Sequence, residues 1–427
     1  MHKVKDIKLA KQGKINIALA EAEMPVMRQI TKDFSAKGGS ASGGKKHQPF
    51  NNLTVACCLH VTKETAILVK ALAAGGARVA LCASNPLSTQ DDVAAALAVQ
   101  KINVFAWKGI SQKDYYTCLN KVLDFKPQIV IDDGADLISA IHTHRQELLK
   151  TVYAGQEETT TGVIRLRAMA KDGALKFPVV AINDTPTKHM FDNYYGTGQS
   201  TMDALLRAMN VLLSGKVVVV AGYGYCGAGM ALRAKGLGAR VVVTEINPLP
   251  ALKAVMDGFE VMPMKQAAKI GDIFLTATGD KDVITSSHMN LMKDGAILGN
   301  SGHFNVEIDV EDMKHESRSM KQVRDQVVQY DMKDGRRLYL IAEGRLMNLA
   351  AAEGHPSAVM DMSFADQALT CEWLVKNYKD LGQDVYNVPG EIDKRVSKLK
   401  LSALGVKIDV LTPEQKKYLA SWEEGTQ

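Results

Sequence analysis

Acid–base side chains in this sequence stand in short polar segments that follow apolar runs. Lys188 and Asp192 are four residues apart, so they would be neighbours on one face if their segment is helical. A buried lysine near another positive group has a lowered pKa and can take a proton from a hydroxyl. The alternative is a surface ion pair, which contributes little to stability.

Two further segments carry groups of the same kind. His60 follows the run TVACCL, and Asp132 and Asp133 end the run QIVIDD. One aspartate is expected to cap the next helix, which leaves the other free for acid–base chemistry. Thr62 can cap its own helix, so a satisfied histidine in a capped turn is the simpler interpretation of His60. We favour a functional role because His60 follows a strand of the first predicted sheet.

Three more polar positions allow both a structural and a functional interpretation. Glu157 and Glu158 precede the hydroxyl run 159–161, which offers ligand-binding groups but is also typical of a helix start. His303 follows a glycine-containing strand end, a common place for groups near a nicotinamide. His355 precedes a proline, and a chain reversal is the simpler interpretation there.

Residues 217–247, VVVVAGYGYCGAGMALRAKGLGARVVVTEIN, combine a strand, a glycine turn, a helix pattern and a second strand. Gly222, Gly224 and Gly227 provide a tight turn, close approach to a pyrophosphate and close helix–strand packing. Phosphates would bind at the free N–H groups of the helix start. Glu245 lies about 20 residues beyond the glycines, where a carboxylate binds the ribose of NAD. The stretch predicts an NAD site, with a purely structural glycine turn as the alternative.

The elements that must position these residues alternate between strands and helices. Strands are predicted at TVACCL, RVALCAS, NVFAW, QIVIDDG and VVAIN, and after them at VVVVA, RVVVT, FEVMP, DIFLTAT and AILGNSG. Helices are predicted to start at Thr62, Gln90, Gln112 and Leu137, and to include GVIRLRAMA and Met202–Leu213. This alternation is typical of parallel sheets with helices on both faces.

The expected fold class is therefore α/β, with two doubly wound, parallel-sheet, Rossmann-like domains and a cleft between them. The predicted division is 1–185 with 355–392 as a substrate-binding catalytic domain, 196–350 as an NAD-binding domain and 393–427 as a small C-terminal oligomerisation segment. Within these, 15–34 is predicted as one helix, 38–52 as a mobile loop and DTPTKHMFDNYYG as a polar segment.

Composition argues against several classes of function. The net charge of +5 comes from 52 basic and 47 acidic residues without a basic stripe, so no nucleic-acid partner is expected. No apolar run reaches about 18 residues and no export signal is evident, so we expect a cytoplasmic protein without a membrane partner. The six cysteines show no metal-binding spacing, so we expect buried thiols and no metal site.

Longer stretches of the sequence are recognisable as a set: CLHVTKETAIL, SNPLSTQDD, DDGADL, EETTTGV, INDTPTKHMFDN, GYGYCGAG, VTEINP, SGHFNVEIDV, AEGRLMNLA and GHPSAVM. Through them the chain resembles the S-adenosyl-L-homocysteine hydrolase family over nearly its whole length. The resemblance implies a tightly held NAD that oxidises the substrate ribose at its 3′-hydroxyl and is restored at the end. Between these steps the 4′-hydrogen is lost, homocysteine leaves from the 5′ carbon, and water adds.

The resemblance also implies roles for individual residues. The catalytic set would be His60, Asp133, Glu158, Lys188, Asp192 and His303. The substrate would be bound by Thr62, Glu64, Thr65, Asp133, Glu158, Lys188, Asp192, His355 and Met360. NAD would be bound by Thr159, Thr160, Thr161, Asn193, Gly222, Gly224, Tyr225, Cys226, Gly227, Glu245, Thr278, Asn300, Ser301, Gly302, His303, Asn348 and His355.

The chain departs from many members of that family in two features. It has GYGYCGAG where many relatives have GYGDVGKG, and its last residues, SWEEGTQ, lack a tail that bears lysine and tyrosine and reaches a neighbouring subunit's cofactor site. We therefore expect NAD to exchange more readily here. The implied assembly is a homotetramer with the charged C-terminal segment at subunit contacts. The implied small-molecule partners are S-adenosylhomocysteine, adenosine and homocysteine.

Three other functions remain as alternatives. Glu64 would accept a hydrogen bond from the amine of adenine, but the ring nitrogen of hypoxanthine can also donate, so an S-inosyl-L-homocysteine hydrolase is one alternative. An NAD-dependent dehydrogenase of a nucleoside or hydroxy acid is another, and it would release reduced cofactor. A non-catalytic sensor of this fold is disfavoured because the whole acid–base set is present.

Overall fold

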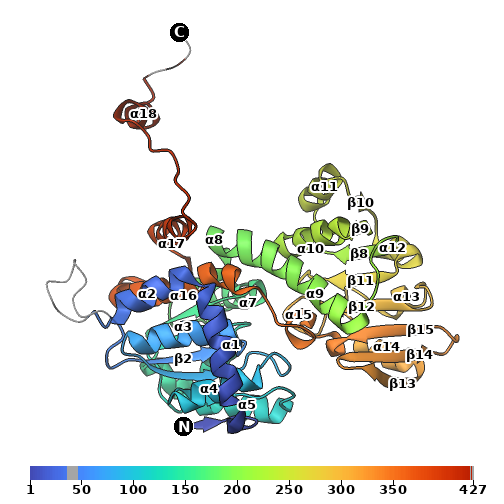
Figure 1. The fold of residues 1–427 in the computed structure, drawn as a ribbon, viewed down its shortest axis with the longest axis horizontal. Coiled ribbons are helices and arrows are strands. Elements are labelled where there is room, and N and C mark those ends of the chain that lie inside the picture. The colour runs from blue at the N-terminus through green and yellow to red at the C-terminus, as the bar shows by residue number, and fades with distance from the viewer. Residues whose placement is uncertain (36–46, 424, 426–427) are drawn as a thin grey trace.

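The computed structural model describes residues 1–35, 47–423 and 425, and the chain is organised around two eight-stranded sheets (Figure 1). The segment 38–52 was expected to be a mobile loop. Residues 38–46 of it lie outside the described residues, and residues 49–52 form turns. Among the described helices, none is long and apolar enough to cross a membrane.

The first sheet is parallel throughout. Alternate residues of its central strand enter different apolar clusters, so the sheet is buried on both faces and its strands are continuous apolar runs. The chain order reverses between β2 and β5, where a binding crevice is expected at the carboxyl ends. The strand order is β1 (His2–Lys3), β4 (Asn103–Phe105), β3 (Arg78–Cys82), β2 (Thr54–Cys58), β5 (Ile129–Asp132), β6 (Ala154–Glu157), β7 (Val179–Ala181) and β16 (Val385–Asn387).

The second sheet is parallel except at one edge. Its order is β10 (Glu260–Val261), β9 (Arg240–Thr244), β8 (Val217–Ala221), β11 (Ile273–Thr276), β12 (Ala296–Asn300), β15 (Arg337–Ile341), β14 (Val327–Met332) and β13 (Ser317–Arg324). β14 pairs antiparallel with both β13 and β15, an edge that the sequence pattern did not indicate, and the rest of the sheet is parallel as predicted. The order reverses between β8 and β11, which places the glycine turn after β8 at a second crevice.

Helices cover both sheets, in agreement with the predicted fold class (Figure 1). Around the first sheet they are α1 (Ala10–Ala22), α2 (Pro25–Ser35), α3 (Lys63–Ala74), α4 (Asp91–Val99), α5 (Gln112–Leu123), α6 (Asp136–Thr143), α7 (Thr160–Lys171), α16 (Ser357–Asn377) and α17 (Gly390–Ala403). With the second sheet lie α9 (Thr197–Met209), α10 (Tyr225–Gly236), α11 (Pro248–Met256), α12 (Met264–Ile270), α13 (Ser286–Met289), α14 (Val310–Glu316) and α15 (Met347–Ala350).

One sequence prediction of local structure is corrected, and two elements were not predicted. Residues 15–34 form parts of two helices, because the first ends before Pro25 and this proline starts the second. The polar segment after β7 is helical, with α8 (Pro186–Lys188) followed directly by a π-helix, η4 (His189–Gly196). The strand β6 was not anticipated, because its sequence AGQE carries no apolar pattern.

A C-terminal arm projects from the body of the protein (Figure 1). Helix α17 packs beside α16 and α2, whereas the chain beyond it runs outward to α18 (Pro413–Leu419). The arm exposes apolar side chains, and Trp422 is 91% exposed. Such exposure is typical of a surface that another chain covers.

Gly229 lies where α10 crosses the π-helix, and a Cβ built there would be 2.0 Å from the carbonyl oxygen of Tyr194. We predict that Gly229→Ala lowers stability by about 1–3 kcal/mol, because overpacking forces the two backbones apart. Calorimetric unfolding measures the loss. Gly236→Ala in the same helix is the matched control, since its Cβ would meet no atom within 4 Å. Equal losses in the two variants would contradict this account.

Candidate active site

A cleft with about 820 Å³ of free space, part of it open to solvent, is lined by residues that follow strands of both sheets. It brings together most of the residues predicted from sequence, namely His60, Thr62, Glu64, Thr65, Asp133, Glu158, Thr159, Thr160, Lys188, Asp192, Asn193, Cys226, Ser301, His303, Asn348, His355 and Met360. The predicted residues that do not line it are Thr161, Gly222, Gly224, Tyr225, Gly227, Glu245, Thr278, Asn300 and Gly302.

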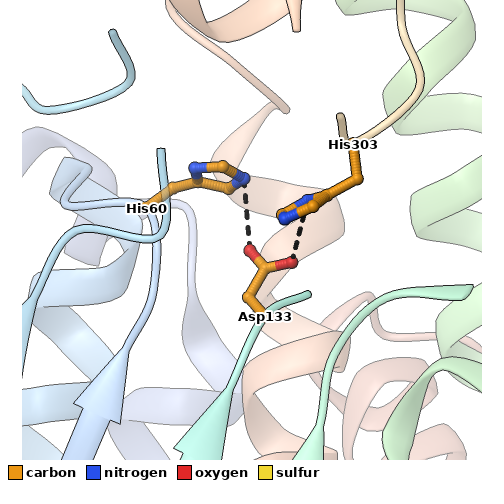
Figure 2. Close-up of side chains that lie close together, drawn as sticks. All are labelled: His60, Asp133 and His303. Carbon is orange, nitrogen blue, oxygen red and sulfur yellow. Dashed lines mark ion pairs between the residues drawn. The ribbon is translucent and has the colours of Figure 1, made fainter. Parts of the chain in front are cut away.

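One group in the cleft joins the two domains at Asp133 (Figure 2). One oxygen of its carboxylate is 3.2 Å from Nε2 of His60, which follows β2, and the other is 3.5 Å from Nδ1 of His303, which follows β12. The Nδ1 atom of His60 is 2.7 Å from the hydroxyl of Ser88, which fixes the ring. Burial lowers the pKa of His60 to about 4, although Asp133 opposes this shift. His60 is therefore a neutral imidazole at neutral pH, able to accept a proton.

The same three side chains have a second chemical capability. Their ligand atoms lie within 4.8 Å of one another, and two imidazoles with a carboxylate are a common donor set for transition metals. Sequence spacing did not suggest a metal site, because the donors come from segments far apart in the chain. Since an imidazole–carboxylate–imidazole group also serves proton transfer without a metal, the expectation of no metal stays a prediction.

A second group surrounds the amine of Lys188. Its Nζ is 2.8 Å from Oδ1 of Asn193 and 3.5 Å from carboxylate oxygens of both Glu158 and Asp192. Burial lowers the pKa of Lys188, but Asp192 and Glu158 raise it by more, so the net pKa lies above its ordinary value. Among the protein's own groups Lys188 is thus an ammonium ion, and the lowered pKa expected beside a positive group stays a prediction.

The carboxylates beside Lys188 are held by further side chains. Burial raises the pKa of Glu158 to about 7, although Lys188 opposes the shift, and Ser363 and Gln367 of α16 donate to its two oxygens. Asp192 lies 3.1 Å from Nδ1 of His355. Burial opposes ionisation of Asp192, but the Lys188 ammonium and the hydrogen bond with His355 lower its pKa to about 2. His355 is therefore part of the site as well as of a chain reversal.

The far wall of the cleft presents Glu64, in the first turn of α3. Its Oε1 accepts a hydrogen bond of 2.6 Å from Ser357 and lies 3.4 Å from the Lys63 amine. Thr62 caps α3 by accepting from the backbone N–H of Thr65, as predicted. Glu64 is only 2% exposed, so its carboxylate can recognise a hydrogen-bond donor at little competition from water.

The predicted cofactor residues outside this cleft gather at the second crevice. A Cβ on Gly227 would lie 1.9 Å from the carbonyl oxygen of Gly222, which confirms why the turn needs glycine. Glu245 directly follows β9 and accepts from the backbone N–H groups of Tyr223, Ile246 and Asn247. These contacts fix the carboxylate in the place where an NAD ribose is recognised.

Asn348 gives an independent test of whether the site fits NAD. Its Nδ2 contacts Ser200 and His355, whereas its Oδ1 is buried without a partner among the described residues. Buried acceptors are normally satisfied, so this oxygen calls for a donor such as a carboxamide N–H. The residues present therefore fit the nicotinamide end of NAD.

Sequence reasoning missed several supporting side chains. Glu307 is buried and accepts hydrogen bonds from Thr278 and from the backbone N–H of Gly279. Ser88 and Ser363 orient His60 and Glu158. Ser88 lies in the recognisable stretch SNPLSTQDD, Glu307 lies in SGHFNVEIDV, and Ser363 lies in an apolar helix. None of these sequence features indicated which side chain the residue contacts.

The buried, neutral His60 predicts a loss of stability in acid. Below the ordinary pKa of 6.5 the unfolded chain binds a proton that the folded protein takes up only near pH 4. Stability therefore falls as the pH is lowered across this window, by roughly 3 kcal/mol from this group. His60→Gln should remove that part of the slope, measured as unfolding temperature against pH. The exposed His315 provides the control variant His315→Gln. An unchanged slope in His60→Gln would contradict the prediction.

Comparison with known proteins identifies the family of this chain. Residues 1–154 match the family model for S-adenosyl-L-homocysteine hydrolase, and 193–354 match the model for its NAD binding domain. The chain is 58% identical over 424 residues to adenosylhomocysteinase of Aquifex aeolicus, covering 99% of both chains. It is 54% identical to S-inosyl-L-homocysteine hydrolase of Methanocaldococcus jannaschii and 54% identical to adenosylhomocysteinase of Sulfurisphaera tokodaii, covering 100% of each.

Among solved structures, a dipicolinate synthase chain from Bacillus halodurans aligns with a TM-score of 0.47 and 13% identity over 77% of this chain and 99% of its own. With family models on both domains and relatives this similar along its full length, the chain belongs to the S-adenosyl-L-homocysteine hydrolase family.

Proposed function

We propose that this enzyme reversibly hydrolyses S-adenosyl-L-homocysteine to adenosine and L-homocysteine, using NAD that is restored in every cycle. The observation that carries the proposal is the pair of groups in one cleft: Lys188 with two carboxylates, and Asp133 between two histidines. Family membership supports the same activity and the cofactor. One group suits the ribose hydroxyl, and the other suits proton transfer at the neighbouring carbons.

NAD would be held at the second crevice by the glycine turn and Glu245, and in the cleft by Asn348. When bound, NAD supplies a reversible two-electron acceptor and, in its oxidised form, a positive charge. A positive charge in the site lowers the pKa of Lys188, which the two carboxylates otherwise hold high. The lysine can then take the proton of the 3′-hydroxyl, and Glu158 is placed to accept a hydrogen bond from a ribose hydroxyl.

The His60–Asp133 pair is assigned to the elimination. Oxidation at the 3′ carbon acidifies the 4′-hydrogen, and a base is then needed for that hydrogen and an acid for the leaving thiolate. His60 is neutral at neutral pH and its Nε2 lies against the Asp133 carboxylate, so the pair together can take up a proton. Asp133 stabilises the imidazolium that forms, and His303 on its other oxygen closes the cleft from the second domain.

The proposed activity predicts thiol release from S-adenosylhomocysteine without accumulation of free reduced cofactor. Lys188→Ala should lower kcat by about 10³-fold, because it removes the base for the first proton transfer. Thiol release is measured colorimetrically, and reduced cofactor by absorbance after removal of the protein. Lys121→Ala, at an exposed surface lysine, is the control. Equal rates for Lys188→Ala and the parent would end the assignment, and released reduced cofactor would favour a dehydrogenase.

An inosyl substrate is the second candidate. The relative from M. jannaschii is named S-inosyl-L-homocysteine hydrolase, and Glu64 can accept from either purine. We propose adenine as the preferred base, because its exocyclic amine is a donor that a buried carboxylate recognises.

Glu64→Gln tests this preference. An amide retains one acceptor and adds a donor, which suits the carbonyl oxygen of hypoxanthine. We expect kcat/KM to fall about tenfold or more for S-adenosylhomocysteine and less for S-inosylhomocysteine. Thiol release from both substrates is compared in parent and variant. A parent that prefers the inosyl substrate would contradict the assignment.

We also propose a homotetramer with the C-terminal arm at subunit contacts. The exposed apolar residues of the arm and of α11, among them Trp422 and the 74% exposed Leu249, support this assembly. Light scattering of the full chain measures the number of subunits.

The cytoplasm is the proposed location, supported by six free cysteines. The domain boundaries predicted from sequence are kept as a proposal, which β16 in the first sheet supports.

We propose that NAD exchanges more readily here than in relatives with GYGDVGKG. Tyr225 is 48% exposed and stacks on His189, so it contributes no charge to the cofactor turn. Retention of a full complement of NAD through extensive dialysis would contradict the proposal.

A further inference from the structure

Glu157 is a buried carboxylate behind the cleft, and none of the roles assigned above uses it. It is the last residue of β6 and 0% exposed. Its Oε1 accepts from the backbone N–H groups of Gly134 at 2.8 Å and Thr159 at 3.0 Å. Its Oε2 accepts from the backbone N–H of Ala135 at 3.0 Å. One side chain thus holds the turn after Asp133 and the start of α7.

The turn after Asp133 needs such a partner. Gly134 has φ +102° and Ala135 has φ +63°, so both are in the left-handed region, which is unfavourable for an alanine. Ala135 is also the N-cap of α6, and its methyl group cannot accept a hydrogen bond. Both residues are buried, so the carboxylate takes the place that water or a capping side chain has elsewhere.

The geometry of this turn decides where Asp133 points. The backbone N–H of Asp133 donates to Asp132, which also accepts from Ile138 and so caps α6, as expected for one of the two aspartates. Glu157 fixes the next two residues of the turn. The Asp133 side chain is thereby held between His60 and His303, with its two oxygens 3.2 and 3.5 Å from their ring nitrogens.

Gly162 also accommodates the Glu157 side chain, because it has no side chain of its own. A Cβ on Gly162, in the first turn of α7, would lie 2.1 Å from the carboxyl carbon of Glu157. A glycine there lets α7 start directly against the carboxylate. This fit explains the glycine in EETTTGV by a contact rather than by the hydroxyl run before it.

The turn after Asp133 depends on Glu157 more than the start of α7 does. Glu158 is held separately by Ser363, Gln367 and its own backbone bond to Asp132, and Thr159 is partly exposed. Gly134 and Ala135 are buried, and a donor that loses its acceptor there pays the full desolvation penalty. Disturbing Glu157 should therefore affect Asp133 more than Glu158 or Lys188.

We propose that Glu157 is a positioning residue for the elimination half of the reaction, acting through the backbone turn that aims Asp133 at His60 and His303. The inference rests on the proposed function and adds a residue to it. It separates two groups of the cleft: the oxidation at the 3′ carbon depends on Lys188, whereas loss of the 4′-hydrogen depends on Glu157 as well.

Two variants test the proposal in the full-length, NAD-loaded protein. Glu157→Gln puts an amide N–H where a backbone N–H already points, and Gly162→Ala pushes a methyl group into an intact carboxylate. We expect both to slow exchange of the 4′-hydrogen of adenosine in heavy water by roughly 10–100-fold. The extent of 3′ oxidation, read from absorbance of the reduced nicotinamide, should change less than about threefold. Exchange is followed by nuclear magnetic resonance.

Asp361→Asn is the matched control. Asp361 is a 0% exposed carboxylate of the same domain that accepts backbone N–H bonds from Val26 and Met27. It should lower the unfolding temperature like Glu157→Gln but leave the ratio of exchange to oxidation unchanged. Equal slowing of both steps in the Glu157 and Gly162 variants, or parental exchange in both, overturns the proposal. A parent protein without exchange or thiol release contradicts the proposed function instead.

Discussion

The contact of Asp133 with histidines from both domains is the constraint on which the rest of the site depends. His60 contacts Asp133 from the first sheet and His303 contacts it from the second. These two contacts fix the distance between the carboxyl ends of the two sheets. A Cβ on Gly134 would lie 2.2 Å from His303, so the close approach also requires a glycine. Lys188 lies on the segment that leads from the first sheet to the second, and His355 lies where the chain returns, so both are close to the places where the two sheets are joined.

Much of the fold could be predicted from the sequence, because parallel strands buried on both faces are continuous apolar runs. The central strands of both sheets have this pattern, and the glycine turn and Glu245 mark the second crevice by spacing alone. The polar residues that end neighbouring strands meet at the cleft for the same topological reason. His60 and Asp133 meet because β2 and β5 flank the reversal in the first sheet, a strand order that the structure supplies.

The rest could not be predicted, for reasons that are physical. β6 has no apolar signature, and the antiparallel edge of the second sheet depends on pairing between strands that local pattern does not record. The π-helix that carries Asp192 reads as a polar segment. The charge of Lys188 is the clearest case, because its pKa depends on Glu158, which lies thirty residues away in sequence and 3.5 Å away in space.

The position of β16 has a consequence for how the molecule is made. This strand completes the edge of the first sheet beside β7, yet the whole second domain is translated between the two. During synthesis the first domain therefore has an unpaired edge at β7 and lacks α16, which holds Glu158. Non-local pairing of this kind is slow, and open sheet edges favour aggregation. We expect the second domain to complete its fold first and the catalytic cleft to form last, when the returning chain closes the sheet.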